Sequence, residues 1–142
     1  MTINFYFEQA VTLTQRARLK TFIGSVFKSE KKRAKTISFI FCSDKYLLNL
    51  NSKFLQHDYY TDIITFDLTN SQTDSKIAEI YISIDRIKDN ARLRDVHIKQ
   101  ELHRVIFHGI LHLCGYKDKS GPQKKLMRAK EDIYLRKYGL LV

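Results

Sequence analysis

The segment from residue 108 to residue 118 places the strongest constraint on how this chain can fold. It reads His-Gly-Ile-Leu-His-Leu-Cys-Gly-Tyr-Lys-Asp, so His108 and His112 are four residues apart. On a helix, residues at this spacing share one face, and both imidazoles can reach one metal ion. Gly115 can adopt the left-handed conformation that ends a helix, which would turn Asp118 toward the two histidines. The segment therefore predicts a metal site at the end of a helix, with His108, His112 and Asp118 as ligands.

Two imidazoles and one carboxylate leave a coordination position open on a metal ion. This ligand set is typical of catalytic zinc, whereas structural zinc is usually closed by four protein ligands. The spacing is similar to that of zincin peptidases, in which a helical histidine pair is followed by a glycine and a third ligand. In zincins the residue after the first histidine is the glutamate general base, but here it is Gly109. The metal geometry is thus expected without the peptidase base.

Each of these features also has a purely structural interpretation. A histidine pair at this spacing arises by chance on helices, and Asp118 could cap the final helix instead of binding metal. We favour the metal site because the glycine turn and the carboxylate accompany the pair. Glu101 and Arg104 share the helical face of the pair, and we expect a surface ion pair there, with a contact to the ligands as the alternative. The remaining histidines are predicted not to be ligands: His57, His97 and His103.

The chain carries an excess of positive charge. Its 142 residues include 25 Lys and Arg against 15 Asp and Glu, a formal net charge of +10. This excess favours a polyanionic partner such as RNA, DNA or an anionic membrane surface, although an ordinary basic surface would look the same. Many of the cations follow the metal motif, where RNA could bind or a helix could simply face solvent: Lys117, Lys119, Lys124, Lys125, Arg128 and Lys130.

Length and composition suggest one domain that spans residues 1–142. No apolar run approaches the length of about 20 residues that a bilayer span requires. The N-terminus lacks the basic leader and apolar core of a signal peptide, so we expect a cytoplasmic protein. Cys42 and Cys114 lie far apart in apolar stretches, which predicts buried, reduced thiols rather than a disulfide.

The spacing of apolar residues predicts alternating strands and helices. Short apolar runs predict four strands, at residues 3–7, 36–42, 62–66 and 77–84. Helical spacing predicts five helices, at about residues 13–28, 43–54, 85–94, 98–113 and from 121 onward. A basic loop is expected at residues 28–35. This order favours an α+β domain in which helices cover a mixed sheet of about four strands.

The stretch His-Gly-x-Leu-His-Leu-x-Gly-Tyr at residues 108–116 resembles the signature of the YbeY family, bacterial endoribonucleases that mature ribosomal RNA. Residues 51–66 are similar to the family's Asn-x-x-Tyr stretch and its Thr-Asp-Val-Leu-Ser-Phe strand, and residues 78–82 to its Gly-Asp-Ile strand. Chain length, element order and basic character agree as well. The resemblance therefore covers nearly the whole chain.

The resemblance implies a single-strand-specific, metal-dependent endoribonuclease that holds one zinc ion per chain on His108, His112 and Asp118. It also implies a role in 16S ribosomal RNA maturation and ribosome quality control. The expected partners are ribosomal RNA and small-subunit components, with neither DNA nor a membrane. The alternative is an RNA-binding ribosome assembly factor with a structural zinc and little cleavage activity. A third hypothesis, a metal-dependent peptidase, is opposed by Gly109, and no general base can be assigned.

Two residues depart from the family pattern. The family usually has Tyr-Asp-His after the second glycine, so Asp118 stands in place of a third histidine ligand. Zinc accepts a carboxylate at about the same distance, roughly 2.0–2.2 Å, but the negative charge lowers its Lewis acidity. Leu55 stands where the family commonly has an arginine implicated in RNA processing. Either Lys53 or His57 supplies the missing charge, or the nuclease activity is weaker than the resemblance implies.

Overall fold

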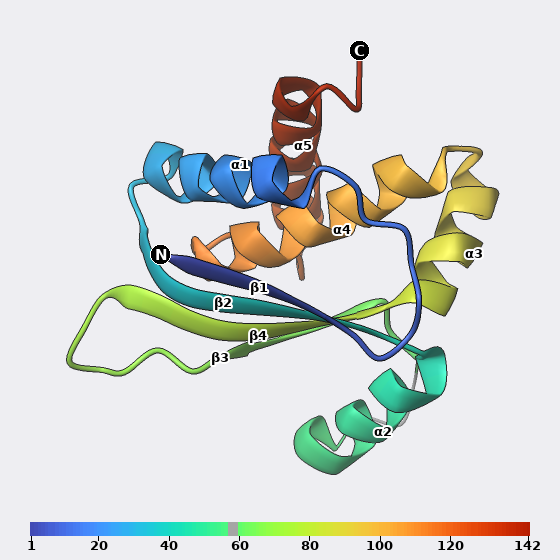
Figure 1. Ribbon diagram of the computed structural model, residues 1–142, viewed down its shortest axis with the longest axis horizontal. Coiled ribbons are helices and arrows are strands. Elements are labelled where there is room, and N and C mark those ends of the chain that lie inside the picture. The colour runs from blue at the N-terminus through green and yellow to red at the C-terminus, as the bar shows by residue number, and fades with distance from the viewer. Residues whose placement is uncertain (57–59) are drawn as a thin grey trace.

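Figure 1 shows the computed structural model of the chain, which describes residues 1–56 and 60–142. The strands are β1 (Thr2–Phe7), β2 (Arg33–Cys42), β3 (Ile63–Asp67) and β4 (Ser75–Ser83). The helices are α1 (Arg16–Ser29), α2 (Asp44–Leu55), α3 (Ile84–Arg94), α4 (Ile98–Leu113) and α5 (Gly121–Tyr138). The α+β prediction is confirmed. No helix in the described ranges is long and apolar enough to cross a bilayer.

One predicted loop is shorter than expected. Residues 33–35, which belong to the basic stretch, extend β2. Arg33 and Ala34 pair with the start of β4, and the register shifts between Ala34 and Thr36. Charged side chains are compatible with such a strand end because Arg33 and Lys35 are exposed to solvent. Charge composition alone therefore misplaced the start of this strand.

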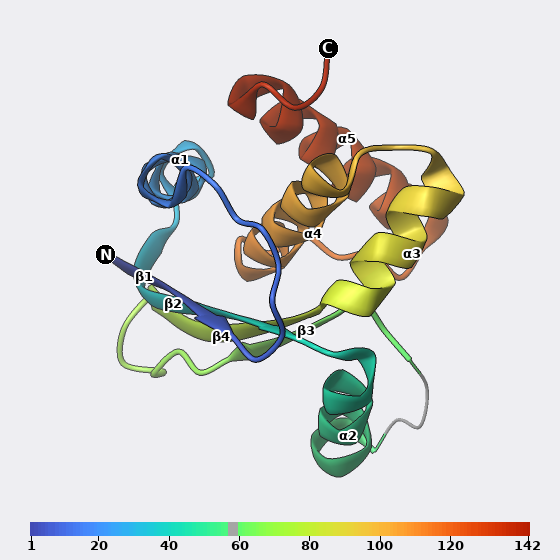
Figure 2. The same cartoon turned by 45° about the vertical axis from the view of Figure 1, so that its right-hand side comes forward.

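The sheet has the order β1-β2-β4-β3. β1, β2 and β4 are parallel, and β3 is antiparallel to β4 at the edge. Alternate side chains of the central strands face the main core, among them Ile37, Phe39 and Ile80. In Figure 2, α1, α3, α4 and α5 lie on one side of the sheet and α2 lies on the other. The main core is thus the layer between the sheet and the four helices.

The helix α4 is the most deeply buried helix of this layer. It contacts α5, α3, α1 and the strands β3 and β4. Most of its residues from Glu101 to Leu113 are buried, and His108 and His112 are the partly exposed exceptions in that range. The two histidines therefore open onto a surface hollow while the rest of the helix is held by packing.

The turn after α4 has the predicted conformation. Gly115 has a φ of +103°, and the Tyr116 N–H donates to the Leu111 carbonyl at 3.1 Å. This pattern ends a helix with a left-handed residue and reverses the chain. The N-cap of α5 is Ser120, whose hydroxyl accepts from the Gln123 N–H at 3.2 Å. The alternative role for Asp118 as the cap of the final helix is therefore wrong.

Both cysteines are free and buried, as the sequence predicted. Burial raises the pKa of Cys42 and of Cys114 to about 12, and nearby carboxylates add to the effect. Neither thiol is reactive at neutral pH, because the thiolate is the reactive form.

Gly109 lies where α4 approaches the sheet most closely. A Cβ atom at this position would lie 3.0 Å from Cδ1 of Ile63 and 3.1 Å from Cγ2 of Ile80. The position therefore faces the sheet and not the hollow into which the histidines open. In this packing, a side chain at position 109 could not serve as the general base that zincins place there.

We predict that Gly109→Glu destabilises the protein by about 3 kcal/mol or more, because it would overpack the helix-sheet contact and bury an unpaired carboxylate. Denaturant unfolding followed by circular dichroism measures the change. The control is Gly121→Ala, since a Cβ at Gly121 would meet no atom within 4 Å. We expect the control to stay within about 0.5 kcal/mol of the wild type. An unchanged unfolding midpoint for Gly109→Glu would show that position 109 does not face the sheet.

Candidate metal centre

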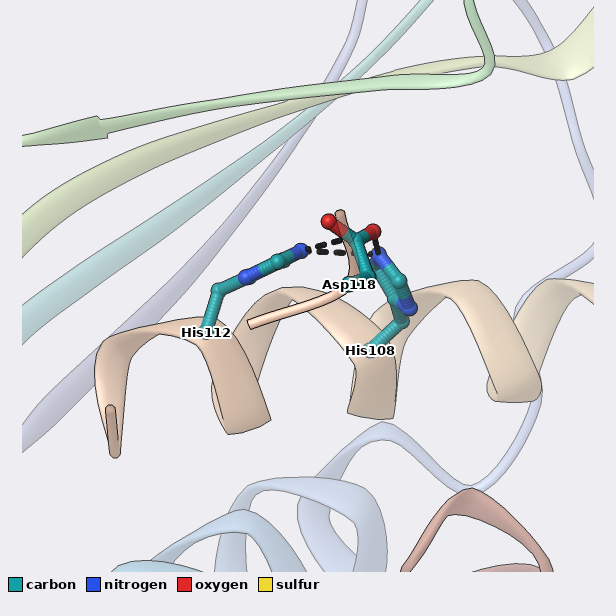
Figure 3. Close-up of side chains that lie close together, drawn as sticks. All are labelled: His108, His112 and Asp118. Carbon is teal, nitrogen blue, oxygen red and sulfur yellow. Dashed lines mark hydrogen bonds and ion pairs between the residues drawn. The ribbon is translucent and has the colours of Figure 1, made fainter. Parts of the chain in front are cut away.

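The side chains of His108, His112 and Asp118 converge at the C-terminal end of α4 (Figure 3). The Nε2 atoms of the two histidines are 3.0 Å apart, and Asp118 Oδ2 lies 3.2 Å from each of them. Ligand atoms that share one ion at about 2.0–2.2 Å must lie on the order of 3 Å from one another. The spacing fits a single small metal ion. Within residues 1–56 and 60–142, no other group of His, Cys, Asp and Glu side chains meets the same criterion.

The Nδ1 atom of each imidazole, which faces away from the three converging donor atoms, has a hydrogen-bond acceptor as its partner. His108 Nδ1 donates to Glu131 Oε2 at 2.7 Å, and His112 Nδ1 donates to the backbone carbonyl of Tyr116 at 2.9 Å. A neutral imidazole that donates through Nδ1 carries its lone pair on Nε2. Two such lone pairs and a carboxylate oxygen would repel one another at these distances unless a cation lies between them. The hydrogen bonds thus orient the three donor atoms for a metal ion.

Glu131 is itself held by a buried ion pair. Its Oε1 lies 3.1 Å from Arg104 Nη1, while Arg104 Nη2 lies 2.8 Å from Asp132. Arg104 and Glu131 are each only 5% exposed. Burial alone would lower the pKa of His108, but the hydrogen bond to Glu131 and the charges of Glu131 and Asp118 hold it above its ordinary value. This cluster fixes the ring of His108 and makes it a more basic ligand.

The expectation of a surface ion pair at Glu101 and Arg104 is wrong. Glu101 is 1% exposed and pairs with Arg94 at 2.7 Å, so it does not bind Arg104. Arg104 is buried because α5 packs against α4 and brings Glu131 to it. The alternative, a contact to the candidate ligands, applies to Arg104, which reaches His108 through Glu131.

Glu131 is the site residue that sequence reasoning missed. It lies thirteen positions after Asp118, on a different helix and among basic residues, so spacing along the chain carried no signal. Tyr116 is a second supporting residue. Its hydroxyl donates to Glu30 at 2.6 Å, and Glu30 also accepts from Tyr134 and Lys130. These contacts anchor the turn whose carbonyl receives His112.

His97 and His103 lie away from the cluster. His97 caps α4, with its Nδ1 accepting from the Lys99 N–H at 3.2 Å. His103 is buried, bonds to the Lys99 carbonyl at 2.7 Å and stacks on Tyr138. His57 lies outside the described residues.

Two hollows meet at the candidate ligands His108 and Asp118, which line both of them together with Asp62, whereas His112 lines only the hollow on the β3 side. The hollow on the α5 side is also lined by charged residues of α3, α4 and α5: Arg94, Glu101, Arg104, Lys124, Arg128 and Glu131. Leu55 lines the hollow on the β3 side, and Lys119 is the one lysine or arginine among the described residues that line it. Lys53 lies over the ring of Phe54 and does not line either hollow.

Known proteins resemble this chain over nearly its full length. The family model described as Endoribonuclease YbeY matches residues 4–139. The Endoribonuclease YbeY of Cytophaga hutchinsonii is 53% identical over 141 residues, which cover 96% of this chain and 97% of the relative. That of Flavobacterium johnsoniae is 44% identical over 130 residues, which cover 92% of each chain. The solution structure of TM1509 from Thermotoga maritima has the same fold, with a TM-score of 0.65, 24% identity and coverage of 97% of this chain and 91% of that one.

We predict that the purified protein contains about one metal ion per chain, and that His112→Ala and Asp118→Ala each abolish this content. Elemental analysis of the dialysed proteins measures it. His97→Ala serves as the control, because His97 lies at the other end of α4 and should keep full metal content. Wild-type protein that stays free of metal after reconstitution would argue against the site.

We also predict that Glu131→Gln weakens metal binding by about 10- to 100-fold, because the amide is a poorer partner for His108 than the carboxylate. Competition with a chromophoric chelator measures the affinity. Asp132→Asn is the matched control, since it removes the same charge and the same Arg104 contact type without touching His108. Equal losses in both variants would mean that the charge near Arg104, and not the hydrogen bond to His108, sets the affinity.

Proposed function

We propose that this chain, which belongs to the YbeY endoribonuclease family, is a zinc-dependent endoribonuclease that acts on single-stranded RNA. The observation that carries the proposal is the convergence of His108, His112 and Asp118 on one point beside two open hollows. We further propose that residues 1–142 form the one domain that carries this activity. The relatives named above are described as endoribonucleases, which supports the same reaction here.

The donor set supports zinc as the metal. Two imidazole nitrogens and one carboxylate oxygen suit zinc and leave a fourth position for water or substrate. Zinc held there would polarise a phosphoryl oxygen or lower the pKa of a water molecule. The protein's own residues supply the positioning. Glu131 and the Tyr116 carbonyl hold the imidazoles in the orientation that ligation requires.

At a finer level, we propose that the substrate is ribosomal RNA and that the protein acts in 16S ribosomal RNA maturation and ribosome quality control. The proposal places it in the cytoplasm, with small-subunit components as partners and with neither DNA nor a membrane. The family resemblance is the main support. The net charge of +10 adds to it, because a basic protein attracts a polyanionic substrate.

A second candidate function is an RNA-binding ribosome assembly factor with a structural zinc and little cleavage activity. Leu55 favours it, because this leucine lines the β3-side hollow where the family commonly has an arginine. Lys119 is the one cation among the described residues that line this hollow. A weaker hold on phosphate there would reduce cleavage without preventing RNA binding elsewhere on the basic surface.

We predict that the zinc-loaded protein cleaves a single-stranded fragment of 16S ribosomal RNA and leaves the same fragment intact when it is annealed to its complement. His112→Ala should reduce cleavage at least about 100-fold, since a metal supplies several kcal/mol of transition-state stabilisation. RNA affinity should persist in this variant. Gel analysis of end-labelled RNA measures cleavage, and fluorescence anisotropy measures affinity.

Two outcomes would point elsewhere. RNA binding and small-subunit association without cleavage, equal in the wild type and in His112→Ala, would identify the assembly factor. Hydrolysis of casein without cleavage of RNA would identify a peptidase.

A further inference from the structure

The cations that follow the metal ligands in the sequence point in different directions. Lys124 and Arg128 line the α5-side hollow together with His108 and Asp118. Lys119 lines the β3-side hollow. Lys130 turns to the opposite side, where it pairs with Glu30 at 3.5 Å. Lys117 and Lys125 line neither hollow.

Lys124 and Arg128 lie on one stripe of α5. They are four residues apart, and Glu131 continues the stripe three residues further, so the three side chains share a helix face. Glu131 reaches His108 at 2.7 Å, which fixes the direction of this face. The stripe therefore runs from the hydrogen bond behind the metal ligand outward along the wall of the hollow.

Most carboxylates that line the α5-side hollow already interact with a neighbouring arginine or histidine. Glu101 pairs with Arg94, and Glu131 pairs with Arg104 and His108. Asp118 faces the two histidines. Among the carboxylates that line this hollow, only Asp62 forms no ion pair within 4.0 Å in the described part of the chain, although its charge helps to raise the pKa of His108.

The two cations of the stripe, by contrast, have no carboxylate partner in the described part of the chain. Lys124 and Arg128 are exposed, and neither forms an ion pair within 4.0 Å in residues 1–56 and 60–142. An exposed cation gains little from distant carboxylates in water but can bind a phosphate oxygen directly. The hollow beside the candidate ligands therefore offers two positive charges to an anion.

We propose that Lys124 and Arg128 form a phosphate subsite for the RNA strand, in which they bind a backbone phosphate next to the one that is cleaved. This proposal rests on the ribonuclease function proposed above. Arg128 can donate two parallel hydrogen bonds to phosphate oxygens, and Lys124 supplies a second charge one helical turn away. The subsite places the flanking phosphate on the α5 side of the metal ligands. It supplies from α5 the positive charge that Leu55 does not supply on the β3 side.

The test compares two double variants that remove the same charge. Lys124→Gln/Arg128→Gln alters the subsite, and Lys117→Gln/Lys125→Gln is the matched control, because its two residues line neither hollow. Zinc content and melting temperature are measured for both to establish that the fold and the metal site are intact. Initial rates of the zinc-loaded proteins on an end-labelled single-stranded RNA give KM and kcat.

We expect the subsite variant to raise KM about tenfold or more and to make the slope of log affinity against log salt shallower by about 1.4, since two contacts to single-stranded RNA are lost. The control should remain within about twofold of the wild type in KM. The swapped variant Lys124→Arg/Arg128→Lys should keep most of the affinity, because both charges persist. Fluorescence anisotropy in a His112→Ala background measures affinity and the salt slope without cleavage.

Equal values of KM and equal salt slopes in the two Gln variants would overturn the subsite. Failure of the proposed function is a different result. In that case the zinc-loaded wild type cleaves no RNA, while the difference in salt slope between the two double variants still decides whether Lys124 and Arg128 bind phosphate.

Discussion

The burial of α4 between the sheet and α5 is the constraint on which the candidate site depends. Close approach at Gly109 holds the helix against Ile63 and Ile80, and α5 covers its other side. A helix held on both sides cannot rotate, so His108 and His112 present fixed positions to the hollow. The position of Asp118 follows from the same helix, because the turn at Gly115 begins where α4 ends. The geometry of the candidate ligands is therefore a consequence of core packing.

A buried chain of charges supports the candidate ligand His108 from behind. Across the α4-α5 contact, Arg104 is hydrogen-bonded to Glu131, and Glu131 is hydrogen-bonded to His108. Burial of a lone charge would cost several kcal/mol, but here each charge has a partner and the chain ends at the candidate metal position. Removal of Glu131 would leave His108 without this partner and Arg104 with Asp132 alone. The packing of α5 against α4 thus also orients the ring of His108. For this reason the supporting residue, Glu131, lies far along the chain from the candidate ligands.

Much of the fold and the convergence of the three candidate ligands could be predicted from local patterns. Apolar periodicity located the elements, and the spacing of His108, His112, Gly115 and Asp118 within one helix and its turn determined the cluster. Features that depend on contact between distant segments could not be predicted in this way. Glu131 is placed by the packing of α5 on α4, and the burial of Arg104 follows from the same contact. For the same reason, the sequence could not show which of the basic residues after the candidate ligands line a hollow and which point away from it.

Asp118 and the stripe on α5 have opposite electrostatic effects at the same place. A carboxylate in place of a neutral imidazole lowers the charge of the site by one and weakens its attraction for phosphate. Lys124 and Arg128 add two positive charges along the wall of the hollow that Asp118 also lines. Their positions on a helix, held by Met127 beneath them in the core, keep these charges near the site without a cost in ligand geometry. A departure from the family's ligand pattern is therefore compatible with phosphate binding, because the charge that it removes is supplied by the neighbouring helix.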